Sequence, residues 1–386
     1  MKPGERLMSL DALRGADMLC IMGASEVVVA LCALSGCPDG WLALQMKHVA
    51  WHGFRHHDTI FPLFLFLAGV SWPFSLAGQL ARGRSTAAIM KKIAVRMLLL
   101  VLLGFATAKF FSFDFVNTRY CNVLGHIGIG WAAAAAISLV VRGTLAKLAI
   151  IAAILAGYWA LLAFTVAPDA AALVASSDPA VAQKIASYAA YGSDGFSFSG
   201  NIIGWFDRKF MPGSLHEVVF DPEGLLSSIS AVATAMMGVL AGEFLRRTNL
   251  SGNRKAFVLA GAGVVCAALA LAWEPWCPIN KKLWTSTFVL ESGAYSLTML
   301  ALFYWIVDVR GWRRWTFCFR VIGMNALAIY LLQRFVNFQF TSKFFLSGVA
   351  GLGDANWSAF VLSMGQMALG WLVLYFLYRK NVFFKV

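Results

Sequence analysis

Residues 47–62, KHVAWHGFRHHDTIFP, lead directly into the apolar run LFLFLAGVSWPFSL at positions 63–76. The first stretch holds four of the six histidines of the chain, together with Asp58. The apolar run predicts a membrane-crossing helix, because a helix satisfies its own backbone hydrogen bonds in lipid. Imidazoles at the edge of a membrane are costly to desolvate, and they titrate near neutral pH. We therefore expect at least one of these histidines to take part in proton or acyl transfer.

Similar apolar runs recur along the chain of 386 residues, of which 60% are hydrophobic and only 13% charged. The mean hydropathy is +0.70. A soluble domain needs a largely polar surface and cannot hide this much apolar side chain. The composition predicts an all-α, polytopic transmembrane bundle in the lipid bilayer, with residues 1–386 forming a single domain. The net charge of +13 does not indicate nucleic-acid binding, because Lys and Arg gather in the cytoplasmic loops of membrane proteins.

The hydrophobic pattern predicts about ten transmembrane helices. Their approximate ranges are 13–34, 58–80, 90–111, 122–141, 145–166, 224–245, 255–273, 285–307, 318–338 and 358–378. With the N-terminus inside, the cytoplasmic segments hold 21 of the 32 Lys and Arg residues. Both termini are therefore predicted to be cytoplasmic, and the histidine stretch is predicted to face the periplasm or lumen. The start of the chain has no small-residue cleavage site, so we expect no cleaved signal peptide.

The long segment 167–223 is predicted to lie outside the cytoplasm, on the same face as the histidines. A loop of this length in a compact bundle is typical of a lid or a binding surface. The seven cysteines show no metal-ligand spacing. Cys37 and Cys277 both fall in predicted outer loops, where a disulfide between them could form, although no spacing supports it.

Polar residues inside the predicted spans are the next candidates. Asp11, Arg14 and Asp17 are spaced by three residues and share one helix face. Two interpretations stay open: an Asp–Arg pair that holds the helix in register, or an Arg14 that faces a phosphate-bearing ligand. Asn325 follows Gly323, where a small residue allows close helix approach. Asn325 is either an interhelical hydrogen-bonding residue or a ligand contact.

The histidines allow two interpretations. His48, His52 and His56 are spaced by four residues and would line one face of a helix, as in some metal sites. No acidic or cysteine ligand is obviously placed to complete such a site, so no metal is predicted. The sharper hypothesis makes His48 a catalytic base or nucleophile, with Asp58 as the carboxylate that orients it.

Six blocks of sequence carry a family resemblance. They are RLMSLDALRGADM at 6–18, the histidine stretch from Lys47-His48 to Phe61-Pro62, Arg119 with Val123-Leu124 and Ile127-Gly128, FDPEGLL at 220–226, PINKKLWT at 278–285 and GMNALAIY at 323–330. In this order, over nearly the whole chain, they resemble the transmembrane acyltransferases related to heparan-α-glucosaminide N-acetyltransferase. The resemblance implies that acetyl-CoA binds from the cytoplasmic side. Its acetyl group would pass to an amine, typically that of a terminal glucosamine, on the outer face.

The family's active-site histidine matches His48, which the charge pattern independently assigns to the outer face. His48 would either take the proton of the attacking amine or carry the acetyl group itself, and both routes stay open. Asn325 or a loop amide would supply a donor to the developing oxyanion. Basic residues at the inner face would meet the CoA phosphates, although they also fit ordinary positive-inside anchoring. The residues expected to bind the donor are Arg14, Asp17, Arg96, Arg119, His126 and Asn325. The residues expected to bind the acceptor at the outer face are Glu223, Lys281, Lys282 and Trp284.

The chain also departs from the family pattern. Gly125 and His126 stand where relatives commonly carry a Gln-Arg pair, and Ser25 replaces an asparagine of the eukaryotic members. The lost pair removes hydrogen-bond donors, so the acceptor is expected to differ from the familiar one. The chain is expected to lack the extra outer domain of eukaryotic relatives, which favours a bacterial inner-membrane enzyme for periplasmic amino sugars, and the family is compatible with a homodimer. One alternative is a sugar O-acyltransferase. Another is a permease or exporter of a sugar or lipid intermediate, and the lack of an internal repeat argues against this transporter hypothesis.

Overall fold

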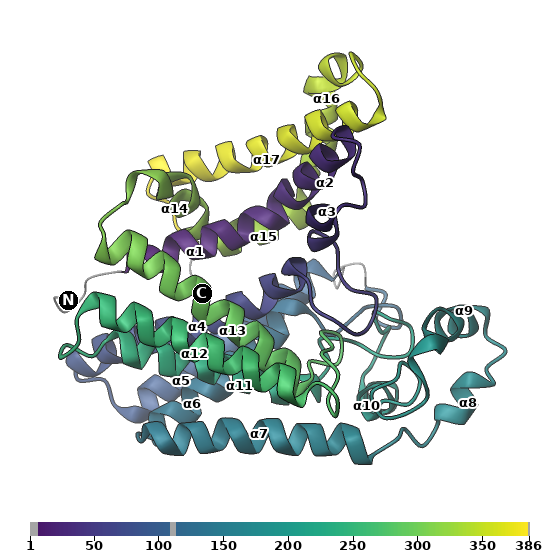
Figure 1. Cartoon of the computed structure of the whole chain (residues 1–386), viewed down its shortest axis with the longest axis horizontal. Coiled ribbons are helices and arrows are strands. Elements are labelled where there is room, and N and C mark those ends of the chain that lie inside the picture. The colour runs from purple at the N-terminus through teal and green to yellow at the C-terminus, as the bar shows by residue number, and fades with distance from the viewer. Residues whose placement is uncertain (1–6, 109–112, 385–386) are drawn as a thin grey trace.

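The computed structural model describes residues 7–108 and 113–384, and within these ranges it contains helices and no β-sheet (Figure 1). The predicted all-α fold is confirmed. The first span is composite and consists of α1 (Met8–Leu19), a π-helical turn (Cys20–Ala24) and α2 (Ser25–Leu34). The other long helices are α4 (His56–Ala81), α5 (Thr86–Thr107), α6 (Val123–Val140), α7 (Thr144–Phe164), α11 (Ser227–Leu245), α12 (Gly252–Trp273), α13 (Ser286–Phe303) and α17 (Ala355–Arg379). Lys2, Arg6 and Lys385, which count in the charge pattern, lie outside the described residues, as does the end of the predicted span 90–111.

Eight helical stretches in the described ranges are long and apolar enough to cross a membrane. A ninth predicted span is broken, because the stretch Arg314–Gly323, which ends with α14 (Phe317–Gly323), meets α15 (Ala326–Phe335) at an angle of 57°. The predicted span 90–111 corresponds to α5, which carries Lys91, Lys92 and Arg96 and is not among the eight. The structure therefore supports eight or nine of the about ten predicted spans.

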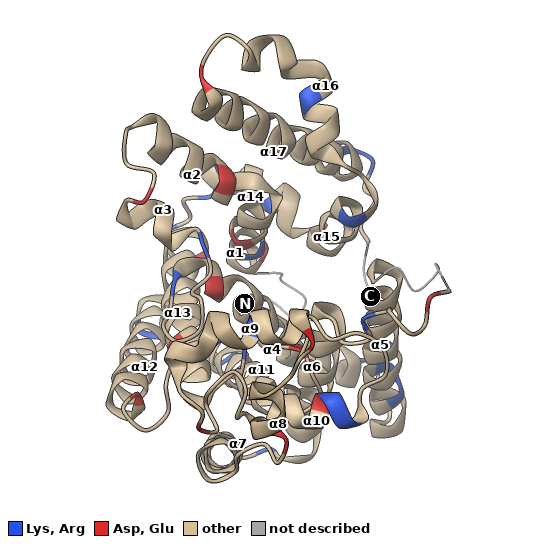
Figure 2. Cartoon of the chain, turned by 90° about the vertical axis from the view of Figure 1, so that its right-hand side faces the viewer, with Lys and Arg blue, Asp and Glu red and all other residues tan. Residues whose placement is uncertain are grey.

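The two ends of the bundle differ in character. Helix α1 begins and α17 ends toward the same end of the bundle (Figure 1). The opposite end carries the segment 167–223, which folds into the short helices α8 (Ala170–Val174), α9 (Pro179–Tyr188) and α10 (Ile202–Phe210). In Figure 2, which faces this end, basic and acidic residues adjoin on α10. The side of the membrane on which each end lies stays a prediction.

Close helix packing at the centre depends on glycine. Helices α4 and α11 cross so tightly that a Cβ atom on Gly238 would lie 2.1 Å from the carbonyl oxygen of Phe66. Helix α14 approaches α1 in the same way, because a Cβ on Gly323 would lie 1.8 Å from the carbonyl oxygen of Asp11. Only a residue without a side chain permits such backbone contact. The close approach predicted at Gly323 is confirmed.

Two helices differ from the predictions, and one question that the sequence left open, whether Cys37 and Cys277 pair, is answered. The short α3 (Trp41–Gln45) and the longer α16 (Phe338–Ala350) were not expected. Helix α16 starts where Asn337 accepts a hydrogen bond from the amide of Phe340 at 2.8 Å, which separates it from α15. Cys37 is exposed, Cys277 is buried and both are free thiols, so the disulfide is absent.

The helices form two groups with separate apolar cores. One core joins α4, α6, α11 and α13 and also includes Leu10 and Leu13 of α1, whereas the other joins the later part of α1, at Met18, to α14, α15 and α17. A third core lies under the segment 167–223 and includes Trp51, Phe198, Phe220 and Leu283. The candidate site lies between the two helix groups and reaches this third core.

Candidate active site

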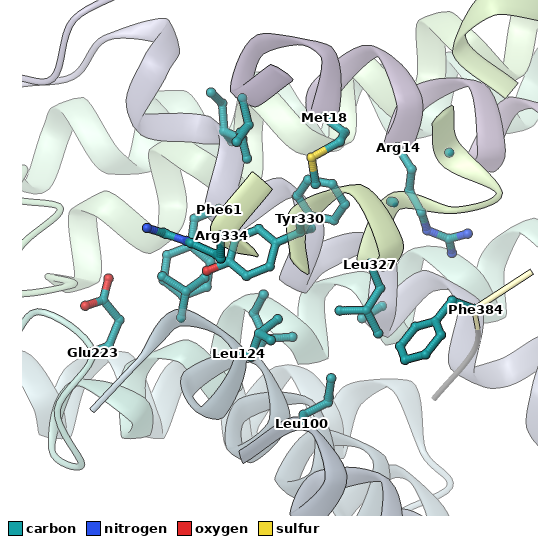
Figure 3. Close-up of a pocket in the computed structure, with 18 of the residues that line it drawn as sticks. Arg14, Met18, Phe61, Leu100, Leu124, Glu223, Leu327, Tyr330, Arg334 and Phe384 are labelled. Atoms are coloured by element: carbon teal, nitrogen blue, oxygen red, sulfur yellow. The ribbon is translucent and has the colours of Figure 1, made fainter. Parts of the chain in front are cut away.

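A cavity of about 690 Å³ lies between the two helix groups. Figure 3 shows Arg14 and Phe384 toward one end of it and Glu223 at the other, with Leu124, Leu327 and Tyr330 between. The middle is therefore apolar, and charged or titratable side chains lie at both ends. Its polar and charged lining residues are Arg14, His48, His57, Ser71, Arg96, Arg119, His216, Glu223, Lys281, Tyr330 and Arg334.

The end marked by Arg14 is basic. The Arg14 guanidinium donates to the Ser71 hydroxyl and lies 3.2 Å from a carboxylate oxygen of Asp11. The Arg96 guanidinium lies 4.1 Å from the ring centroid of Trp131. Among the described residues, the buried Nε of Arg96 has no hydrogen-bond partner. An unpaired buried donor costs free energy, which an anionic ligand group would recover.

His48 lies at the other end of the cavity, in the loop between α3 and α4. Its Nδ1 is 2.7 Å from Oδ1 of Asp58, whose side chain is only 1% exposed. Asp58 is the third residue of α4, and its second oxygen accepts hydrogen bonds from the amides of Val49 at 3.4 Å and Arg55 at 3.2 Å. The Arg55 guanidinium in turn donates to the His48 carbonyl oxygen at 3.1 Å. The start of α4 thus holds both the loop and the imidazole in place.

Two further groups crowd His48. The His57 ring centroid is 4.5 Å from that of His48, and His57 Nδ1 is 3.2 Å from the hydroxyl of Ser25. Lys281, in the loop between α12 and α13, places Nζ 3.1 Å from His48 Nδ1 and 3.6 Å from Oδ1 of Asp58. Burial lowers the pKa of Lys281, although Asp58 and Glu223 oppose that effect.

A second cavity of about 340 Å³ adjoins the first and opens toward the segment 167–223. Aromatic residues and charged groups both line it, which is an arrangement suited to a sugar. The residues that line both cavities are His48, Phe61, His216, Glu223 and Lys281. The other lining residues of the second cavity include Trp51, Asp58, Tyr188, Glu217, Lys282 and Trp284. His48 therefore lies where the two cavities meet.

Glu223 is held at this junction by Arg119. The Arg119 guanidinium donates two hydrogen bonds of 2.6 Å to Asp221 and also contacts the Glu223 carboxylate. Burial raises the pKa of Glu223 to about 7, although the charge of Arg119 opposes the shift. Glu223 is thus a carboxyl group that changes its charge near neutral pH.

The structure brings most of the predicted site residues to the two cavities. Arg14 lies at the basic end of the first cavity, and Arg96 lines the same cavity close enough to Arg14 for their charges to interact. Arg119, predicted to bind the donor, lies instead near His216 and Glu223, away from that end. The predicted residues around the junction and the second cavity are His48, Asp58, Glu223, Lys281, Lys282 and Trp284.

Three residues predicted to bind the donor line neither cavity. Asp17 is buried in α1, and its Oδ2 has no hydrogen-bond partner among the described residues. His126 is buried against Trp284, with ring centroids 4.8 Å apart, and its Nδ1 lies 3.3 Å from the Ser228 hydroxyl. The side-chain amide of Asn325 donates to the carbonyl of Val382 and accepts from the amide of Phe384, both at 2.9 Å. Asn325 therefore anchors the segment after α17 and is not placed to donate to an oxyanion at His48.

Two other expectations are corrected by the geometry. His48 and His52 lie in a loop, and only His56 lies on helix α4, so the three do not share a helix face. Trp284, expected at the outer face, is only 1% exposed and its indole N–H lies 3.3 Å from the Thr234 hydroxyl, so it could meet an acceptor only as a wall of the second cavity.

Several cavity residues had not been predicted. Lys282 contacts the hydroxyl of Tyr188 at 2.7 Å and the carboxylate of Glu217 at 2.6 Å. Tyr188 and Glu217 belong to the segment 167–223, and no local pattern indicates that they approach a lysine so far along the chain. His57 lies within the histidine stretch, but spacing alone cannot tell which ring approaches His48.

Comparison with known proteins gives two relatives and no matching family model. Human heparan-alpha-glucosaminide N-acetyltransferase is 25% identical over an alignment of 432 positions, which covers 99% of this chain and 60% of the human protein. The mouse protein of the same name is 25% identical over 394 positions, covering 88% of this chain and 56% of the relative. The chain thus spans less than two thirds of the length of these curated relatives. Near-complete coverage by two such matches makes the chain a relative of heparan-alpha-glucosaminide N-acetyltransferase.

Proposed function

We propose that the chain is a transmembrane acetyltransferase that moves an acetyl group from acetyl-CoA to the amine of an amino sugar. The observation that carries the proposal is the position of His48, where an elongated cavity with a basic end meets a second cavity lined by aromatic and charged groups. The relationship to heparan-alpha-glucosaminide N-acetyltransferase supports the same reaction class. The donor and the acceptor would then approach His48 from different cavities.

Acetyl-CoA would occupy the larger cavity, with its phosphates toward Arg14 and Arg96. Guanidinium groups bind phosphate oxygens strongly, and Arg96 Nε lacks a partner among the described residues. The apolar middle of the cavity suits an extended thioester-bearing arm. This orientation brings the acetyl group to His48, and it corresponds to entry of the donor from the cytoplasm.

His48 would perform the acyl chemistry. An amine attacks a thioester only in its neutral form, so a nearby base is useful. When His48 Nδ1–H donates to Asp58, Nε2 is free to accept the proton of the amine in a direct transfer. Nε2 could equally attack the thioester carbonyl, so that the C–S bond breaks and the CoA thiolate leaves, and then pass the acetyl group on to the amine. In both routes Asp58 stabilises the positive charge that develops on the imidazole.

The acceptor would occupy the smaller cavity. Trp51 and Tyr188 offer aromatic surface to a sugar ring, and Lys282 and Glu217 offer hydrogen bonds to its hydroxyls. The Glu223 carboxylate would bind the ammonium group of the acceptor before that ammonium loses its proton. If the end of the bundle at which α1 begins faces the cytoplasm, the second cavity faces the periplasm. The acceptor would then reach a bacterial inner-membrane enzyme from the periplasmic side.

The test is acetyl transfer by the purified full chain in detergent, with labelled acetyl-CoA and a panel of amino sugars and sugars. The proposal predicts labelled N-acetyl product with wild type and none with His48→Ala. His52→Ala is the matched control, because His52 belongs to the same loop but lines neither cavity. A melting temperature unchanged in the variants excludes unfolding.

Other results would replace the proposal. O-acetyl products alone would reassign the chain as a sugar O-acyltransferase. A folded protein that neither binds nor consumes acetyl-CoA would contradict acyl transfer and favour a permease. Binding is detected independently as a rise in melting temperature, because a ligand of the native state stabilises it.

A further inference from the structure

Two side chains of opposite charge converge on one nitrogen of His48. Oδ1 of Asp58 lies 2.7 Å from Nδ1, and Nζ of Lys281 lies 3.1 Å from the same atom. Both are held by local structure. Asp58 is fixed by the amides of Val49 and Arg55. Lys281 follows Asn280, whose side chain accepts from the amide of Leu283 at 2.9 Å.

A neutral imidazole cannot satisfy both partners at once. A ring nitrogen that carries a hydrogen donates, and one that carries a lone pair accepts. If Nδ1–H donates to Asp58, Nε2 keeps its lone pair and can take a proton or an acetyl group. If the Lys281 ammonium donates to Nδ1, the ring hydrogen must lie on Nε2, which can then accept neither.

We propose that Lys281 is a positioning residue that selects the tautomer of His48. A charged Lys281 favours the Nε2–H form, and loss of its proton releases Nδ1 to donate to Asp58. No bond between heavy atoms changes in this step: the Nζ–H bond of the ammonium breaks and its proton goes to solvent, while the ring loses the hydrogen on Nε2 to water and gains one on Nδ1 from water. The meaning for catalysis rests on the proposed acetyltransferase function, but the tautomer itself does not.

The surroundings of Lys281 determine the pH at which its ammonium group loses a proton. Burial lowers the pKa of Lys281, so its proton leaves at a lower pH than that of an exposed lysine. The negative charges of Asp58, from α4, and Glu223, from the segment before α11, raise the pKa of Lys281, whereas the positive charge of the adjacent Lys282 lowers it further. The remaining titratable or charged groups at the junction are Arg55, His57, Arg119, His216 and Glu217.

The experiment is nitrogen NMR of the ligand-free full chain in detergent, with ¹⁵N-labelled histidine and a series of pH values. Protonated and unprotonated ring nitrogens give well-separated signals, so the two tautomers are counted directly. A His48→Gln sample identifies the His48 signals. The variants are Lys281→Met, which is similar in length but uncharged, and Lys281→Arg, which stays charged.

We expect wild type to shift from the Nε2–H form to the Nδ1–H form as the pH rises. Lys281→Met should favour the Nδ1–H form at every pH where the ring is neutral. Lys281→Arg should favour the Nε2–H form. Its ratio of the Nε2–H to the Nδ1–H tautomer should be about tenfold higher than that of Lys281→Met, because hydrogen bonds from charged donors are strong. Lys47→Met is the matched control, since Lys47 pairs with Asp39 and not with His48. It should behave as wild type.

Equal tautomer ratios in wild type and both Lys281 variants would overturn the proposal, as would a shift in the opposite direction. Unchanged signals from the other histidines show that a variant is folded. The pH profile of acetyl transfer provides a second reading, in which Lys281→Met should lack the rise with pH that wild type shows. If wild type transfers no acetyl group, the proposed function fails, and the NMR result still decides the role of Lys281.

Discussion

Replacing Asp58 by asparagine removes the carboxylate that orients His48. The side chain keeps its size, so the contacts with the amides of Val49 and Arg55 can persist through the amide oxygen. The group facing His48 Nδ1 then becomes an NH₂ donor at about the position of Oδ1. It favours the tautomer with hydrogen on Nε2, which leaves no lone pair there for the proton or acetyl group.

The expected loss follows from two contributions. The 2.7 Å contact between Asp58 and His48 becomes charge-assisted when the imidazole gains positive charge in the reaction. A correctly placed general base contributes about 10²–10⁴-fold to a rate. We therefore expect kcat for acetyl transfer to fall by about 10²–10⁴-fold, equivalent to roughly 3–5 kcal/mol of transition-state stabilisation. Binding of acetyl-CoA at the distant basic end should change little.

The assay is the initial rate of labelled N-acetyl amino-sugar formation at saturating donor, together with the acetyl-CoA dissociation constant of each variant. Asp39→Asn is the matched control, because Asp39 is exposed and pairs only weakly with Lys47 at 3.4 Å. It should retain wild-type kcat. An Asp58→Asn enzyme that keeps kcat within about tenfold of wild type, with His48 still required, would refute the reasoning.

Three other predictions concern different parts of the molecule. The Glu223 carboxyl, with a pKa of about 7, is charged above that pH and neutral below it, so the acceptor KM of wild type should rise as the pH falls through 7. Glu223→Gln should have a high acceptor KM at every pH. If the acceptor KM of wild type and of Glu223→Gln changed with pH in the same way, the Glu223 carboxylate would not bind the acceptor. Gly238→Ala places a methyl group 2.1 Å from the Phe66 carbonyl oxygen and should cost about 1–3 kcal/mol. It should lower the melting temperature, whereas Gly261→Ala, with open space around its Cβ, should not. Asn325→Ala removes both hydrogen bonds to Val382 and Phe384, so amide exchange at 382–384 should accelerate; unchanged exchange would mean that packing alone holds the segment.

The helical fold was predictable because apolar runs of membrane-spanning length leave few alternatives. The exceptions are local. Helix α5 carries three basic residues, and the bend between α14 and α15 falls at Met324-Asn325, where Asn325 turns its side chain to the segment 382–384. Helix α16 separates from α15 at the Asn337 cap. Hydropathy averages over a window, so it does not report such single-residue features.

The candidate site was predictable where residues are close in sequence or share a motif. Asp58 follows His48 by ten positions, and the motif that contains Lys281 and Trp284 pointed to the same site. Asn325 and His126 were predicted to bind the donor but do not line the first cavity. The sequence shows that a polar residue lies inside a span, but it does not show which way the side chain points. Partners from the segment 167–223, such as Glu217, could not be predicted, since their approach depends on how that segment folds over Trp51.

The central claim is that acetyl groups pass across the membrane through the site at His48. The most direct test uses proteoliposomes that contain glucosamine inside and receive labelled acetyl-CoA outside, with the cytoplasmic end of the protein facing out. Labelled N-acetylglucosamine should accumulate inside with wild type and with His52→Ala, and be absent with His48→Ala. Product that forms only when donor and acceptor are on the same side, or label that remains in acetyl-CoA, would contradict the claim.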